Sequence, residues 1–177
     1  MFRYSLAVIT VVTLAACSTA APPRTLPASV DPTSLPEAAR AALDAKWPKS
    51  WSVAPLAPQL TSCLSGKSVS PVVVADFDSD NASDLAAAIT TPQGVRLVVL
   101  LQRDDHYAVF NVDAIDPASP VAVGLEKRGA PYTKADTLFR DFYSADTVTA
   151  YTCNGATTSY FWGGLDFYKV ALAPSPR

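Results

Sequence analysis

Four aspartates stand close together in one short segment of this 177-residue chain, and they are the side chains best suited to binding a ligand. They occupy positions 1, 3, 5 and 9 of a nine-residue stretch: Asp76, Asp78, Asp80 and Asp84. No Lys or Arg lies within the stretch, so the carboxylates repel one another unless a cation neutralises them. Ca²⁺ takes several oxygen ligands at about 2.4 Å and tolerates a flexible loop. The spacing therefore predicts a calcium-binding loop.

The rest of the segment offers a main-chain ligand and a turn. The backbone carbonyl of Ala82 falls at position 7, where calcium loops commonly use a main-chain oxygen. Asn81, at position 6, tolerates the left-handed conformation that a sharp turn requires. Ala87 stands at position 12 in place of a bidentate Glu, which excludes an EF-hand. The alternative interpretation is an Asp-rich turn held by side-chain-to-backbone hydrogen bonds without a metal.

Residues 73–86 resemble the calcium loop of FG-GAP/VCBS-type repeats, whose consensus reads roughly V-x-x-D-F-[DN]-x-D-G-x-x-D-L-A, with Asn81 in place of Gly. In those repeats the loop joins two antiparallel strands, and many copies form a propeller. The chain holds one copy, so the resemblance implies neither a propeller nor an adhesive role. The chain is more similar to uncharacterised exported bacterial proteins that pair one such loop with a C-terminal aromatic hairpin, here Tyr160 to Phe167.

Short apolar runs separated by turn residues position this loop. They are 72–75, 85–89, 95–101, 107–112 and 121–125. Their spacing of roughly ten residues predicts an antiparallel meander. Of the sixteen acidic residues only Glu37 and Glu126 are Glu, and an excess of Asp, which favours turns and caps, is typical of a loop-rich β protein.

One helix is expected before the meander and a shorter one after it. Ser34 to Glu37 has the pattern of a capping box, and Pro48 ends the helical spacing that follows. Trp47 is expected to pack this helix onto the sheet. A short helix is also expected around 134–142. The predicted fold class is α+β, mostly an antiparallel β meander with one N-terminal helix.

The N-terminus has the pattern of an export signal. An apolar run from Leu6 to Leu14 is too short to span a membrane, so residues 1–16 are interpreted as a signal peptide. Leu14-Ala15-Ala16-Cys17 resembles the lipobox of bacterial lipoproteins, which implies acylation of Cys17. The alternative is an unlipidated signal peptide with a chance Cys. Residues 17–32, rich in Pro and Ala, are expected to form a tether, 33–173 a single domain and 174–177 a flexible tail.

The resemblance to lipoproteins also implies a location. More than one acyl chain gives stable membrane anchoring. Ser18, rather than Asp, follows the lipidated Cys and implies the outer membrane of a bacterial cell envelope, facing the periplasm or exported to the surface. Export also favours disulfides, and Cys63 and Cys153 are then the two remaining cysteines. A bond between them is predicted, with two separate thiols as the alternative.

The aromatic hairpin has two interpretations. Gly163-Gly164 is expected to form a two-residue turn between aromatic strands. Tyr160, Trp162 and Phe167 then fill a core, which is the commoner outcome for such residues, or form a patch that binds a partner.

The composition and net charge exclude some classes of protein. Hydrophobic residues make up 49% of the chain, which excludes a wholly disordered protein, and a net charge of −2 gives no electrostatic footprint for nucleic acid. His106 is the only His, and it stands at an expected turn. We predict a non-catalytic binding or structural protein whose partner is an envelope protein or polymer. The alternative is a small exported hydrolase whose carboxylate site the spacing does not reveal.

Overall fold

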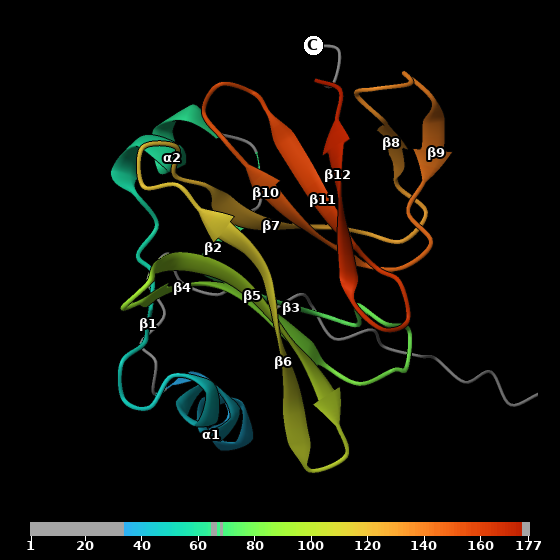
Figure 1. Ribbon diagram of the computed structural model, residues 1–177. Coiled ribbons are helices and arrows are strands. Elements are labelled where there is room, and N and C mark those ends of the chain that lie inside the picture. The colour runs from blue at the N-terminus through green and yellow to red at the C-terminus, as the bar shows by residue number, and fades with distance from the viewer. Residues whose placement is uncertain (1–33, 65–66, 68, 175–177) are drawn as a thin grey trace, which may run out of the picture.

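The structure is a computed structural model that describes residues 34–64, 67 and 69–174 (Figure 1). The expected signal peptide (1–16), Cys17 with its tether (17–32) and the end of the tail (175–177) lie outside these residues. In Figure 1 the described chain forms three layers: helix α1, a first sheet above it, and a second sheet above that.

Both sheets are antiparallel, which confirms the predicted mostly-β α+β class. The first sheet contains β1 (Ser52–Val53), β3 (Val72–Ala75), β4 (Asp84–Thr91), β5 (Gly94–Arg103) and β6 (His106–Ile115). Strands β3 to β6 form the meander, and β1 pairs with the end of β4 beside β3. The second sheet runs in the order β12 (Phe167–Leu172), β11 (Thr157–Trp162), β10 (Thr147–Tyr151), β7 (Ala122–Glu126), β2 (Val69–Ser70).

The first sheet is buried on both faces, and the strand period of two explains how. In β4, Leu85 and Ile89 point to α1, whereas Ala86 and Ala88 point to the second sheet. Inward-pointing residues of the second sheet, such as Val148, pack against them. Alanines on the inner face of β4 leave room for the side chains of the second sheet. The same inter-sheet core includes Phe77, which follows β3.

Helix α1 (Glu37–Lys46) covers the outer face of the first sheet. Trp47 packs against the same cluster, as predicted. The N-cap of α1 is Pro36, two residues after the Ser34 at which the predicted capping box begins. The ring of Pro36 fixes its φ, here −51°, at a value suited to the start of a helix. No helix among the described residues is long and apolar enough to cross a membrane.

Three other expectations differ from the structure. A second helix, α2 (Pro58–Cys63), was not predicted. Residues expected to be helical around 134–142 instead contribute to a hairpin of β8 (Pro131–Thr133) and β9 (Arg140–Phe142), whose aromatic and β-branched residues favour strands. The loop between β11 and β12 has four residues rather than two, because Trp162 pairs with Phe167.

The longer hairpin loop has a conformational cause. A two-residue primed turn of type I′ needs positive φ at both glycines, but of the two only Gly164 has one, at 92°. The amide of Gly163 donates to the carbonyl of Asp166 at 2.9 Å, which closes the wider loop. The shift is by an even number of residues, so each aromatic side chain keeps the face that the sequence predicted.

Candidate functional site

The acidic loop connects β3 to β4, as the resemblance implied. Its start is anchored by Phe77, which is almost fully buried in the inter-sheet core. Asp84, at the other end, is fully buried and accepts two backbone hydrogen bonds of 2.8 Å each. Its Oδ2 accepts from the amide of Phe77 and its Oδ1 from the amide of Gln102. One carboxylate therefore ties both ends of the loop to the end of β5.

The other three carboxylates also accept hydrogen bonds from the loop's own backbone, that of Asp78 from the amide of Asp80 at 3.4 Å. Asp76 accepts from the amides of Asp80 and Asn81 at 3.1 and 3.0 Å, and Asp80 accepts from the amide of Ala82 at 2.8 Å. Ser79 and Asn81 have φ of 64° and 69°, the left-handed conformation that the sequence had assigned to Asn81. The side-chain-to-backbone turn considered from sequence is thus present, and it presents carboxylates on a preformed loop.

Three of the four aspartates converge. Carboxylate oxygens of Asp76, Asp78 and Asp84 all lie within 4.8 Å of one another. Two oxygens on opposite sides of one Ca²⁺ lie up to about 5 Å apart, given ligand distances of 2.3–2.6 Å. The group therefore has dimensions that fit a calcium ion, with carboxylates as the hard ligands it prefers. Asp80 does not belong to this group, and Ala82 contributes its amide to the turn described above.

Arg103 enters the loop from the end of β5, and sequence analysis did not identify it. Its guanidinium Nη1 lies 2.6 Å from Asp78 Oδ2 and 3.0 Å from Asp80 Oδ2. The strand register explains this position. Leu85 at the start of β4 pairs with Leu100 of β5, so Arg103, three residues further along β5, lies beside the loop that precedes β4. A cation that pairs with two of the aspartates is thus supplied by a neighbouring strand rather than by the loop.

The charges of the loop and its burial shift the pKa values of the groups around it. Burial raises the pKa of Asp84 to about 6, against the opposing effect of its two backbone hydrogen bonds, and the charges of Asp78 and Asp80 raise it further. Burial lowers the pKa of Arg103, but its hydrogen bond to Asp78 and the nearby carboxylates outweigh this and raise it. When all four aspartates are ionised, one guanidinium leaves a strongly negative site.

The aromatic hairpin contributes to the core. Tyr160 is buried, and its hydroxyl donates to Asp113 Oδ2 of β6 at 2.8 Å, which links the two sheets. Burial and this hydrogen bond raise the pKa of Tyr160. Trp162 and Phe167 each pack edge-on against Phe110, with ring centroids 5.2 and 5.7 Å from it, and their own two rings are tilted with centroids 5.1 Å apart. Of the three predicted patch residues, none presents a fully exposed ring, because all three pack between the sheets.

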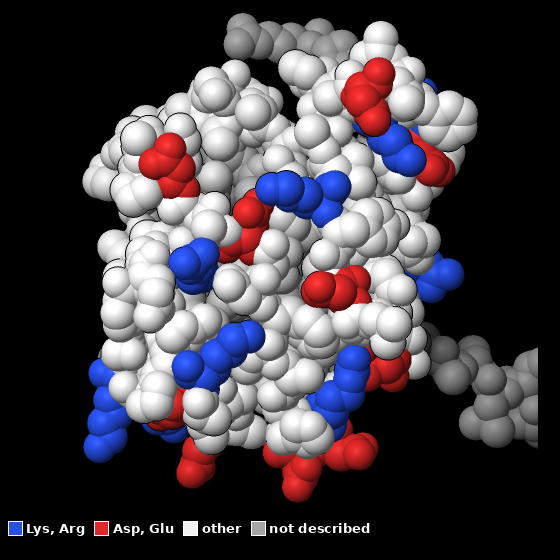
Figure 2. Space-filling view, in the orientation of Figure 1, with Lys and Arg blue, Asp and Glu red and all other residues white. Residues whose placement is uncertain are grey.

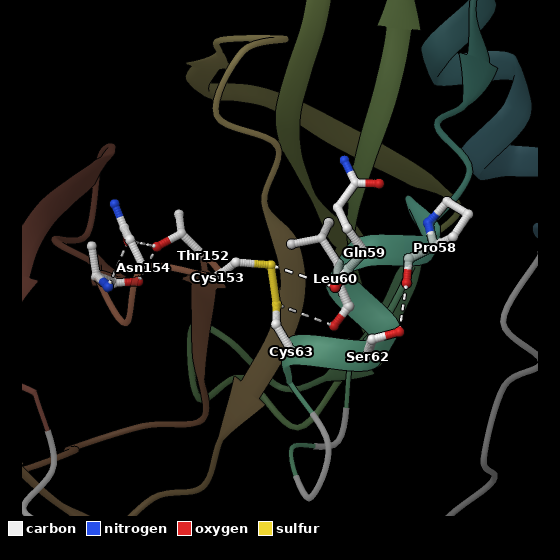
Figure 3. Close-up of a disulfide and its surroundings, with 9 residues drawn as sticks. Pro58, Gln59, Leu60, Ser62, Cys63, Thr152, Cys153 and Asn154 are labelled. Carbon is white, nitrogen blue, oxygen red and sulfur yellow. Dashed lines mark hydrogen bonds between the residues drawn. A yellow bond between two sulfur atoms is a disulfide. The ribbon is translucent and has the colours of Figure 1, made fainter.

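The predicted disulfide between Cys63 and Cys153 is present. Cys63 and Cys153 form a disulfide with an S–S distance of 2.03 Å. Figure 3 shows that it joins the end of α2 to the turn that follows β10. It therefore ties α2 to the end of β10 in the second sheet.

Comparisons with known proteins return nothing for this chain: no family model, no curated protein and no solved structure matches it.

Proposed function

We propose that this protein is a lipid-anchored, non-catalytic binding domain of a bacterial cell envelope whose acidic loop holds a structural Ca²⁺. The observation that supports the calcium site is the convergence of Asp76, Asp78 and Asp84 within 4.8 Å. The FG-GAP/VCBS-like pattern of residues 73–86 agrees with it. Export and anchoring are supported by the lipobox-like sequence that ends at Cys17 and by the disulfide.

In this proposal each residue of the loop has a distinct role. Asp76, Asp78 and Asp84 would hold the ion, and main-chain oxygens such as that of Ala82 and water would complete its coordination. The bound ion supplies positive charge that relieves the repulsion among the carboxylates. Because Arg103 pairs with Asp78, one of the three converging aspartates, the guanidinium and the ion compete for that carboxylate.

The side chains that line an apolar cavity between the two sheets favour a binding role over hydrolysis. Its lining residues include no Asp, Glu, His, Lys, Arg, Cys or Tyr, so no general acid or base faces it. His106 has a side chain that is 68% exposed at the β5–β6 turn, beside the exposed Asp105. On the face drawn in Figure 2, acidic and basic side chains alternate without a continuous basic stripe.

Calorimetric titration with Ca²⁺ tests the site. We expect saturable binding with a dissociation constant of roughly 10⁻⁴–10⁻³ M, the range of extracellular modules. Asp78→Ala should abolish it, because this removes a central ligand. Asp105→Ala removes a fully exposed carboxylate near the β5–β6 turn and should leave binding unchanged. Absence of binding heat in the parent protein at millimolar Ca²⁺ would refute the site.

Metabolic labelling with a radioactive fatty acid tests the anchor. In a bacterial host we expect label in the protein and recovery in the membrane fraction, because the lipobox-like sequence places Cys17 at the cleavage site. Cys17→Ser should lose both the label and the membrane association. Equal labelling of the parent and Cys17→Ser would exclude lipidation at this residue.

A further inference from the structure

A cavity of about 230 Å³ opens at one end of the inter-sheet core, remote from the acidic loop in the fold. The buried floor is made by Ala88 of β4 and Val123 of β7, which belong to the inter-sheet cluster. Its outer wall is the segment before α2 together with Leu60 of that helix, which Figure 3 shows beside the disulfide. Pro55 and Pro117 line the cavity and are exposed to solvent, so they mark its mouth.

The walls are held in place on several sides. Four prolines line the cavity, and their ring-locked backbone resists collapse. The amide of Ala54 donates to the carbonyl of Ala88 at 2.8 Å, which fixes the outer wall to β4. Asp116 accepts from the amides of Ala118 and Ser119 at 2.9 Å each and closes the turn beside Pro117. The disulfide at Cys63 holds α2. Native interiors retain few voids larger than a water molecule, and these fixed walls keep this one open.

The chemistry of the lining selects the ligand. The lining side chains are aliphatic or proline except Ser70. The hydroxyl oxygen of Ser70 accepts a hydrogen bond from the amide of Val72 at 3.4 Å. Apolar atoms make up most of the lining, and no lining side chain could pair with a charged group buried here. An apolar cavity of about 150 Å³ holds one benzene, so this one accommodates about nine carbon atoms. We infer that the cavity binds the end of a neutral alkyl chain, with the remainder of the molecule outside the mouth.

The inference is independent of the calcium site, since no loop aspartate lines the cavity. It is tested with straight-chain alkanols of five to twelve carbons, followed by the methyl resonances of Ala54, Ala88 and Val123. Saturable shifts at these methyls are expected. Affinity should rise about fourfold with each methylene up to about nine carbons and then level off, because further carbons lie in solvent. No saturable shift, or an even rise to twelve carbons as in surface partitioning, would overturn the inference.

Cavity-filling variants supply a second readout. Ala54→Leu places a larger side chain in the cavity and should weaken nonan-1-ol binding at least tenfold. Val121→Trp, in the loop before β7, serves the same purpose if the first variant folds poorly. The control variant Ala45→Leu also replaces Ala with Leu, but at an exposed position of α1, and should alter binding less than twofold. Binding of parent strength in both cavity-filling variants would contradict the inference.

Two further ligands distinguish the source of the alkyl chain. Nonanoate represents a free fatty acid, and a nonanoyl lysolipid represents a membrane lipid. Tighter binding of one identifies the source, and equal binding assigns recognition to the alkyl chain itself. If nonan-1-ol binds but neither nonanoate nor the lysolipid does, the result would contradict the inference that the rest of the molecule lies outside the mouth of the cavity.

Discussion

Replacing Asp84 with Ala is expected to lower the free energy of unfolding by about 3 kcal/mol, since each buried donor left without an acceptor costs about 1–3 kcal/mol. The amides of Phe77 and Gln102 both lose their acceptor in this variant. Asp84→Asn keeps one acceptor oxygen and should recover about half of the loss. Chemical denaturation in the presence of a chelator measures these values without a contribution from Ca²⁺.

The matched control is Asp116→Ala. The side chain of Asp116 also accepts a backbone hydrogen bond within a turn, from the amide of Ala118, but Asp116 is exposed, so that amide can bond to water instead. We expect a loss below about 1 kcal/mol there. If Asp84→Ala were as mild as this control, Asp84 would not be the residue that ties the loop to β5.

The same carboxyl predicts a pH dependence. In the folded state the pKa of Asp84 is about 6, against an ordinary value of 3.8, so between these values the folded protein binds more protons than the unfolded chain. Its contribution to stability is therefore complete below about pH 4 and is lost as the pH rises through 6. The parent should lose about 3 kcal/mol over this range relative to Asp84→Asn. Parallel pH profiles of the two proteins would contradict the raised pKa.

Removal of the disulfide is expected to have the second large effect. Cys63 and Cys153 are 90 residues apart, and closure of a loop of that length stabilises the folded state by about 4.6 kcal/mol in the chain-entropy model. The double variant Cys63→Ala, Cys153→Ala should therefore lose about that much free energy of unfolding. Parent protein treated with a reductant should match the double variant.

The control for this variant is Ser62→Ala. Ser62 precedes Cys63 in α2, and its hydroxyl makes only a long, exposed bond of 3.4 Å to the carbonyl of Pro58. Its loss should change stability by less than about 0.5 kcal/mol. A double cysteine variant that is destabilised by less than about 1 kcal/mol would show that the bond constrains the unfolded chain little.

Much of the fold could be predicted from period and turn chemistry. The alternation of Leu85 and Ile89 in β4, and of Leu97 and Val99 in β5, assigns strands because a side-chain period of two has a direct physical cause. What the alternation did not reveal is that the intervening residues are buried as well. Alanines between larger residues do not look like a second apolar face, but they face the second sheet.

The features that sequence reasoning missed depend on tertiary structure. Helix α2 has only six residues, too few for a helical period to emerge. Arg103 lies 23 residues from Asp80 in the chain, and only the register of β4 on β5 brings them together. The four aspartates were predicted as one site, but only carboxylate oxygens of Asp76, Asp78 and Asp84 converge, and Asp80 lies outside that group.

The central claim is that the carboxylates of the loop form a cation site for which Arg103 competes, and one measurement tests it directly. Calorimetric titration with Ca²⁺ should be compared between the parent, Arg103→Gln, and Arg140→Gln as an exposed control. We predict that Arg103→Gln binds Ca²⁺ about tenfold more tightly, which corresponds to about 1.4 kcal/mol, because Asp78 is released from its ion pair. The control should match the parent. Binding by Arg103→Gln that is no tighter than that of the parent, or no binding in either, would contradict the claim.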